Sequence, residues 1–194
     1  MIAYLKGDFT YKTPALVNIE VQGVGYEVHI SLHTYSAIQS LEKGMLFTYL
    51  LIREDAHILY GFFDKAEREM FIQLIGISGV GATTARMMLS AMKPEEISTA
   101  ILHGNAKQLE SIKGIGKKSA ERIILELRDK LGKAPREVNN STSVSNSSEQ
   151  DALNALISLG IARPAAEQAV RKVMAADQNP GKIEDIIKKA LKTL

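Results

Sequence analysis

Apolar and polar residues alternate with a period of two along residues 1–63. In "ALVNIEVQG", Val17 and Ile19 fall on one face of an extended chain, while Asn18 and Glu20 fall on the other. Similar alternation predicts five short strands, within "MIAYLKGDF", "ALVNIEVQG", "GYEVHIS", "LFTYLLI" and "HILYGFF". Five strands in so short a segment indicate a small OB-like β-barrel, because closure removes the exposed strand edges.

The pattern changes at Asp64 to a helical period that continues to residue 132. Asp64 with Glu67 forms a capping-box signature, and Asn105 with Gln108 forms a second one. Pairs of glycines and a Lys-Pro step interrupt the apolar positions. Residues 64–132 are therefore predicted to form an all-α domain of short helices.

The remaining chain divides into a linker and a small domain. From residue 139 to residue 148, nine of ten residues are Asn, Ser or Thr. Such a segment cannot bury enough apolar surface to offset its ordering entropy, so residues 133–148 are predicted to be a flexible linker. Residues 149–194 carry three amphipathic segments, which predict a three-helix, UBA-like domain. We expect this small domain to contact a partner.

Charge is unevenly distributed, although the formal net charge is only +2. Residues 1–64 carry 4 basic and 7 acidic side chains, whereas residues 65–132 carry 11 and 8. An anionic ligand is therefore expected at the helical domain. The absence of Cys excludes disulfides and thiolate sites. No apolar run reaches the roughly 18 residues of a membrane span, so we expect a soluble, cytoplasmic protein.

The helical domain contains an internal repeat with an offset of 35 residues. "LIGISGVGATTARMML" matches "LESIKGIGKKSAERII" in its glycines, in the apolar residue between them and in the apolar and Ala positions on either side. Each glycine pair lets the chain turn sharply and approach a ligand without a Cβ in the way. The residues of the two turns are Gly79, Val80 and Gly81 in the first copy and Gly114, Ile115 and Gly116 in the second.

The helix after each turn presents free N–H groups and the positive end of its dipole. Lys117, Lys118 and Arg122 lie in or near the first turn of the second such helix, where cations oppose the dipole unless an anion is bound. A plain helix start is the alternative. No Walker loop or dinucleotide fingerprint is present, so the predicted ligand is the DNA phosphate backbone, bound without sequence preference.

These motifs together resemble the RuvA family, whose members recognise Holliday junctions. The resemblance covers the whole chain and includes "MIAYLKG", "VQGVGYEV", "REDAHILYGF", both helix-hairpin-helix motifs and "ALISLGI". It implies binding of four-way junction DNA in branch migration, recombination, DNA repair and the bacterial SOS response. It also implies a homotetramer, or two tetramers per junction, acting with a hexameric RuvB-type ATPase. A RuvC-type resolvase stays open as a further partner.

The resemblance assigns roles to two further parts of the sequence. Glu54 and Asp55, at the tip between two predicted strands, would form an acidic pin at the centre of the tetramer; a solvated turn is the alternative. In the first hairpin, Thr83 stands where the family often has a lysine, so Thr83 and Thr84 offer hydroxyls without charge. We expect this hairpin to bind phosphate more weakly than the second.

The C-terminal domain resembles the part of RuvA that engages the RuvB motor. The matching positions are Leu156, Leu159 and Leu191. Core packing is the alternative for each, and for Leu156 it is the favoured one, whereas Leu159 lies off the apolar stripe.

No catalytic role is predicted. The four histidines have no carboxylate or second histidine at metal-ligand spacing, and no nucleophile motif appears. We therefore expect no cofactor, no metal and no catalytic residue. The competing hypothesis for function is a generic helix-hairpin-helix module that binds duplex DNA and is tethered to a repair enzyme. An acidic hairpin tip, which a duplex binder does not need, favours the junction hypothesis.

Overall fold

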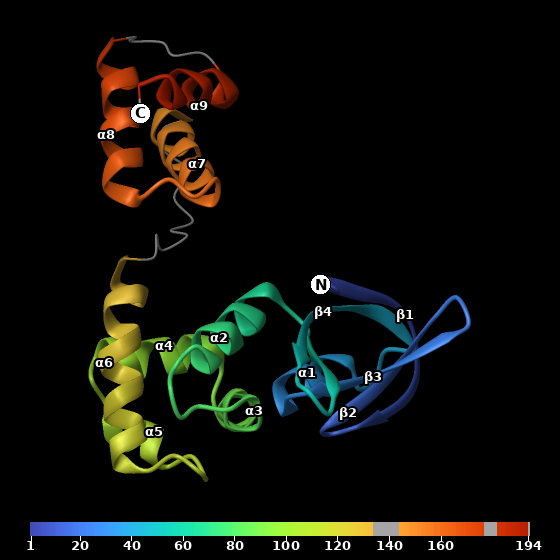
Figure 1. Ribbon diagram of the computed structural model, residues 1–194. Helices are drawn as coiled ribbons and strands as arrows, with labels where there is room; N and C mark the ends of the chain where they lie inside the picture. The colour runs from blue at the N-terminus through green and yellow to red at the C-terminus, as the bar shows by residue number, and fades with distance from the viewer. Residues whose placement is uncertain (134–143, 177–181, 194) are drawn as a thin grey trace. The chain divides into compact units, whose positions relative to one another are not determined.

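The computed structural model describes residues 1–133, 144–176 and 182–193 of the chain. The chain divides into two compact units, Met1–Pro135 and Arg136–Leu194 (Figure 1). None of the helices in these described ranges is long and apolar enough to cross a membrane.

The first unit begins with the predicted closed barrel. Around it the strands follow the order β1-β2-β3-β5-β4, and every neighbouring pair is antiparallel except β3 with β5. The predicted alternation is confirmed, since Val17 and Ile19 are fully buried while Glu20 is exposed. The strands are β1 (Tyr4–Thr13), β2 (Leu16–Val21), β3 (Val24–Ile30), β4 (Lys43–Ile52) and β5 (His57–Phe62).

One element of the barrel domain was not predicted, the helix α1 (Leu32–Ile38) between β3 and β4. Ser31 caps its start by accepting a hydrogen bond from the Thr34 N–H at 3.0 Å. Beyond its end, Lys12 donates from Nζ to the carbonyls of Ile38, Gln39 and Leu41. A cation at a helix C-terminus is favourable because the free carbonyls gather there.

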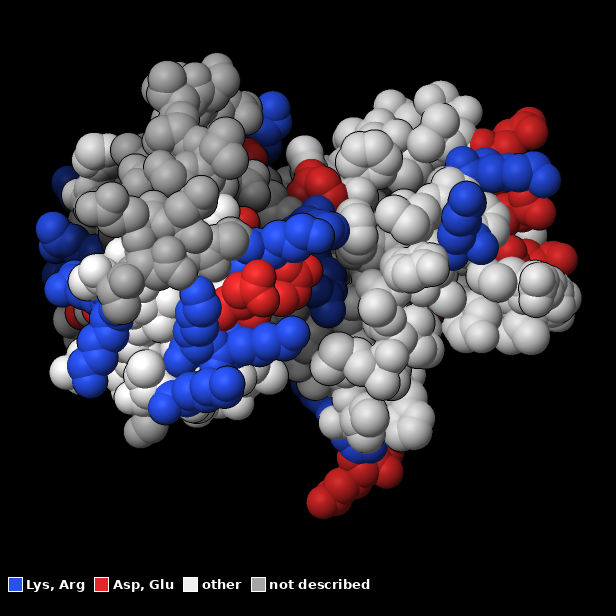
Figure 2. All heavy atoms as spheres, turned by 90° about the horizontal axis from the view of Figure 1, so that it is seen from above, with Lys and Arg blue, Asp and Glu red and all other residues white. Residues whose placement is uncertain are grey.

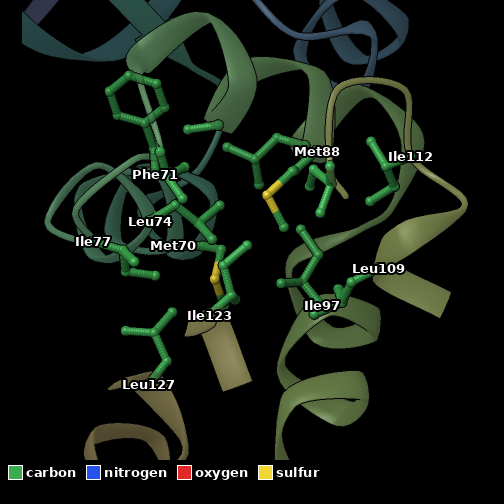
Figure 3. Packing of buried hydrophobic residues seen from close by; sticks show 14 of the residues in the cluster. Met70, Phe71, Leu74, Ile77, Met88, Ile97, Leu109, Ile112, Ile123 and Leu127 are labelled. Atoms are coloured by element: carbon green, nitrogen blue, oxygen red, sulfur yellow. The ribbon is translucent and has the colours of Figure 1, made fainter. Parts of the chain in front are cut away.

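The helical part of this unit shares its core with the barrel. Phe71 of α2 lies with its ring centroid 4.9 Å from those of Tyr60 and Phe62 on β5. Figure 3 shows Phe71 in a buried cluster with side chains from the other helices, including Met88, Ile97 and Leu127. The boundary at residue 63 thus separates two architectures that pack as one body. The helices are α2 (Lys65–Ile75), α3 (Ala82–Ala91), α4 (Pro94–Leu102), α5 (Ala106–Glu110) and α6 (Lys117–Lys133).

The second unit consists of α7 (Val144–Ser158), α8 (Arg163–Ala176) and α9 (Ile183–Leu191), around a core of its own. Most of the predicted linker lies outside the described residues. Its end from Val144 onward belongs to α7, so this helix begins before the predicted domain boundary at residue 149. Ser and Asn are well tolerated near a helix N-terminus, where free N–H groups can use their side chains. A polar composition therefore does not exclude a helix there.

Candidate nucleic-acid interface

The first hairpin connects α2 to α3 through Gly79, Val80 and Gly81. Gly79 has φ +91°, a left-handed conformation that side chains other than glycine adopt only with strain. The Val80 N–H donates to the Ile77 carbonyl at 3.0 Å, and the Val80 side chain is buried in the core. Gly81 precedes α3 as its N-cap. The turn is thus fixed from inside while its glycines face outward.

The second hairpin repeats this geometry 35 residues later, as the sequence repeat predicts. Gly114 has φ +92°, and the Ile115 N–H donates to the Ile112 carbonyl at 3.1 Å. Ile115 is also buried. The first helical bonds match too, from Ala85 to Gly81 at 2.9 Å and from Ala120 to Gly116 at 3.0 Å. The two copies therefore share their backbone hydrogen bonds as well as their sequence.

Both hairpins leave room for a ligand at the backbone. A Cβ built on Gly79, Gly81 or Gly116 would meet no atom within 4 Å. No side chain caps α3, so N–H groups of its first turn stay available to an anion. A phosphate oxygen can therefore approach the main chain at both turns.

The two hairpins differ in charge. Lys117 and Lys118 are exposed in the first turn of α6 and form no ion pair with another described residue. Arg122 is also exposed, but its Nε donates to the Glu126 carboxylate at 2.8 Å. At the first hairpin, Thr83 is exposed and Thr84 is half-buried. Cationic side chains are thus concentrated at the second hairpin.

The acidic tip lies at the far end of the β4–β5 hairpin. Ile52 and His57 form the last pair of the ladder, and the Arg53 N–H donates to the Ala56 carbonyl at 2.8 Å to close the turn. Glu54 and Asp55 between them are exposed. Figure 2 shows further acidic side chains along the outer edge of the barrel, at the right, with basic side chains beside them. The tip thus belongs to the acidic part of the chain.

Sequence reasoning missed a polar network between α1 and α2. The Glu67 carboxylate is buried and accepts hydrogen bonds from the hydroxyls of Ser31 and Thr34 and from the Phe63 N–H. Burial raises the pKa of Glu67, although these hydrogen bonds oppose the shift. The predicted capping box is half formed: Asp64 accepts from the Glu67 N–H at 2.7 Å, but the Glu67 side chain turns to the network instead.

The same region brings His33, Asp64 and Glu67 together, with one possible ligand atom of each within 4.8 Å of the others. The sequence spacing did not indicate this cluster. His33 Nε2 lies 3.6 Å from Asp64 Oδ2. Both Glu67 oxygens, however, already accept hydrogen bonds from the protein. The arrangement serves as a contact between α1 and α2.

Sequence reasoning also missed Arg86, on α3. Its Nη1 donates to the Ala15 carbonyl at 3.0 Å and lies 3.2 Å from His29 Nδ1. Both partners belong to the barrel, 71 and 57 residues away in sequence. No local pattern could indicate such a contact.

In the second unit the three predicted partner residues lie in different surroundings. Leu156 is fully buried and packs in the three-helix core. Leu159 is 62% exposed and Leu191 is 44% exposed. The packing alternative therefore describes Leu156, whereas Leu159 and Leu191 remain available to a partner.

Comparisons with known proteins match the chain along its length. The RuvA N terminal domain matches residues 1–61, a SAM-like helix-hairpin-helix tandem matches residues 71–129, and the RuvA C-terminal domain matches residues 147–194. Proteins named Holliday junction branch migration complex subunit RuvA, from Cytophaga hutchinsonii and Christiangramia forsetii, are each 45% identical. The alignments cover 99% of both chains in the first case and 100% in the second. The chain belongs to the RuvA family.

Proposed function

We propose that this protein binds four-way DNA junctions, holds them in an open planar form and recruits a motor ATPase that drives branch migration. The relatives are named as subunits of a Holliday junction branch migration complex. The observation that carries the proposal is that one compact unit combines an acidic tip with two hairpins whose main chain a phosphate can approach.

The hairpins bind the sugar-phosphate backbone rather than the bases. Free N–H groups at the turns and the dipoles of α3 and α6 stabilise phosphate oxygens. Lys117 and Lys118 add charge and release counterions from the DNA. None of these contacts reads base identity, so junctions of any sequence are bound.

The acidic tip acts where the four arms meet. In a homotetramer, four copies of Glu54 and Asp55 place eight carboxylates around one axis. Their repulsion of nearby phosphates keeps the crossing open and favours separation of strands over tight binding at the centre. The hairpins, farther out along each arm, supply the attraction.

The chain itself performs no catalysis in this proposal. A hexameric RuvB-type ATPase hydrolyses ATP, and the second unit docks on it through Leu159 and Leu191, whose exposed apolar side chains suit a protein contact. A single tetramer covers one face of the junction and leaves the other open to a RuvC-type resolvase, whereas two tetramers cover both faces. The complex acts in the bacterial cytoplasm.

The test is a titration of the protein against a synthetic four-way junction and a linear duplex of equal length, with magnesium at physiological salt. Tighter binding of the junction is expected, because only there can all hairpins of a tetramer engage at once. Equal affinity for the two DNAs would contradict the proposal and favour the generic duplex-binding module.

A further inference from the structure

Helix α3 connects the barrel to both hairpins. Its N-terminus follows Gly81 of the first hairpin. Two successive side chains near its middle then face different parts of the unit. Arg86 reaches the barrel, and the Met87 methyl group lies 3.2 Å from the position of a Cβ on Gly114 in the second hairpin. The orientation of α3 therefore affects both phosphate-binding turns.

Arg86 provides directional contacts to two barrel segments. The guanidinium donates to Ala15, which leads into β2, and contacts His29 on β3. The hydrogen bond to His29 needs a neutral ring with a free lone pair on Nδ1. Burial, followed by the charge of Arg86, lowers the pKa of His29, while Glu27 opposes this shift. The neutral ring is thus the form expected near neutral pH.

The internal repeat indicates what Arg86 does not do. With the offset of 35 residues, its counterpart in the second copy is Glu121, an exposed residue on α6. The second copy has its extra cations at Lys117 and Lys118, where a phosphate would lie, whereas the first copy has alanine and threonine there. The cation of α3 lies in a contact with the barrel instead of at the turn.

A second contact holds α3 one turn farther along. Ser90 accepts a hydrogen bond from the Leu32 N–H at 3.1 Å, and its hydroxyl donates to the Arg86 carbonyl at 2.8 Å. Leu32 begins α1 of the barrel domain. Hydrogen bonds from Arg86 and to Ser90 thus connect α3 to the barrel domain at two points one turn apart, in addition to its apolar packing.

We propose that Arg86 is a positioning residue for junction recognition: its contacts to Ala15 and His29 hold α3, and with it both hairpins, at one angle to the barrel that carries the acidic tip. This inference rests on the proposed function. A linear duplex needs only hairpin contacts, whereas a junction must fit hairpins and tip together. Loss of the contact should therefore affect junction binding far more than duplex binding.

The experiment compares Arg86→Ala with wild type in affinity for the four-way junction and for the duplex. Lys107→Ala is the matched control, since it removes one exposed positive charge from the same domain. In Arg86→Ala we expect the ratio of junction affinity to duplex affinity to fall by about tenfold, equivalent to about 1.4 kcal/mol. Duplex affinity and its salt dependence should stay unchanged. Arg86→Lys should restore part of the ratio, because an ammonium can still donate to Ala15.

Three results separate the possible failures. No junction preference in the wild type would contradict the proposed function itself. A retained preference in Arg86→Ala, at wild-type level, would overturn the positioning role alone. Equal weakening on both DNAs with a flatter salt dependence would mean that Arg86 contacts phosphate directly, which also overturns it.

A measurement on the free protein keeps the inference testable if Arg86→Ala folds poorly. The chain has no Cys, so spin labels can be attached to cysteines introduced at Tyr11 on the barrel and Thr83 on α3, both exposed. Labelled chains are diluted into unlabelled ones to suppress distances between subunits. We expect a narrow distribution of the distance between the two labels when residue 86 is Arg, and a broader one in Arg86→Lys. Identical distributions would overturn the inference.

Discussion

Single residues in the hairpins have separable effects on folding and on binding. Gly79 and Gly81 both lack neighbours that a methyl group would touch, but only Gly79 has a positive φ. Gly79→Ala should therefore lower the free energy of unfolding by about 1–2 kcal/mol, measured by urea denaturation. Gly81→Ala, at the N-cap of α3 and with a negative φ, should lower it by less, about 0.5 kcal/mol.

Gly81→Ala should nevertheless weaken DNA binding, because the added methyl group occupies the path of the phosphate. The two substitutions thus serve as controls for each other. Unchanged DNA affinity in Gly81→Ala would contradict phosphate binding at the first hairpin.

Glu67 gives a pH dependence whose sign follows from burial. Its pKa in the folded state is raised above the ordinary value of 4.5, so above pH 4.5 the folded state binds more protons at this site than the unfolded state does. The contribution of Glu67 to the free energy of unfolding therefore falls as pH rises from 4.5 to the pKa of the folded state. The fall is at most about 1.4 kcal/mol per pH unit. Glu67→Gln removes the titration.

The free energy of unfolding of the wild type minus that of Glu67→Gln should thus fall as pH rises above 4.5. Thermal denaturation at several pH values measures it. A difference that stays constant or grows over this range would show that the Glu67 carboxyl is not raised in pKa by its surroundings.

At the scale of elements, α6 with its lysines should dominate the affinity for DNA. Lys117→Ala with Lys118→Ala should weaken binding and flatten its dependence on salt, because fewer counterions are released. If each subunit of a tetramer makes two phosphate contacts, the wild-type slope of log K against the logarithm of salt concentration should be about −7.

Replacement of Lys188 and Lys189 by alanine is the matched control, because it removes the same charge from α9 in the second unit. It should leave affinity and slope unchanged. An equal effect of both double substitutions would indicate attraction by overall charge and contradict binding at the hairpin.

Elements with strong local patterns were predictable, and those held by distant partners were not. The strands alternate cleanly, and the hairpin repeat predicts two sharp turns, which form at Gly79 and Gly114. In contrast, α1 mixes apolar and polar residues over few turns, and Lys12, 26 to 29 residues away, binds the carbonyls at its end. Arg86 and His29 meet only because the barrel and α3 pack together. Contacts of this kind have no periodic signal in the sequence.

For the whole molecule, substitutions in the second unit should affect docking of the ATPase without affecting DNA binding by the first unit. Leu159→Asp with Leu191→Asp should leave junction affinity and stability unchanged while abolishing stimulation of a RuvB-type ATPase on junction DNA. Leu156→Ala, a core substitution, should instead destabilise the second unit by about 2–5 kcal/mol. Normal ATPase stimulation by the Leu159/Leu191 variant would place the docking surface elsewhere.

The acidic tip should matter for processing of the junction more than for its capture. Glu54→Gln with Asp55→Asn should leave junction binding intact or make it tighter, because repulsion at the centre is removed. An electrophoretic titration against the wild type measures this. A large loss of affinity would mean that the tip makes attractive contacts and would contradict its role as a repulsive pin.

The duplicated hairpins share their main-chain geometry but differ in what their side chains contact. Their turns form the same main-chain hydrogen bonds, but position 86 of one copy carries a cation bound to the barrel while position 121 of the other carries an exposed acid. Because each glycine turn offers main-chain N–H groups to a phosphate, the side chains of the two copies can differ without removing that contact. In our proposal both copies bind phosphate, the first also positions α3 against the barrel, and the second adds the charge of its lysines. Exchanging Thr83 and Lys118 between them would therefore be a direct way to ask how much of each role is transferable.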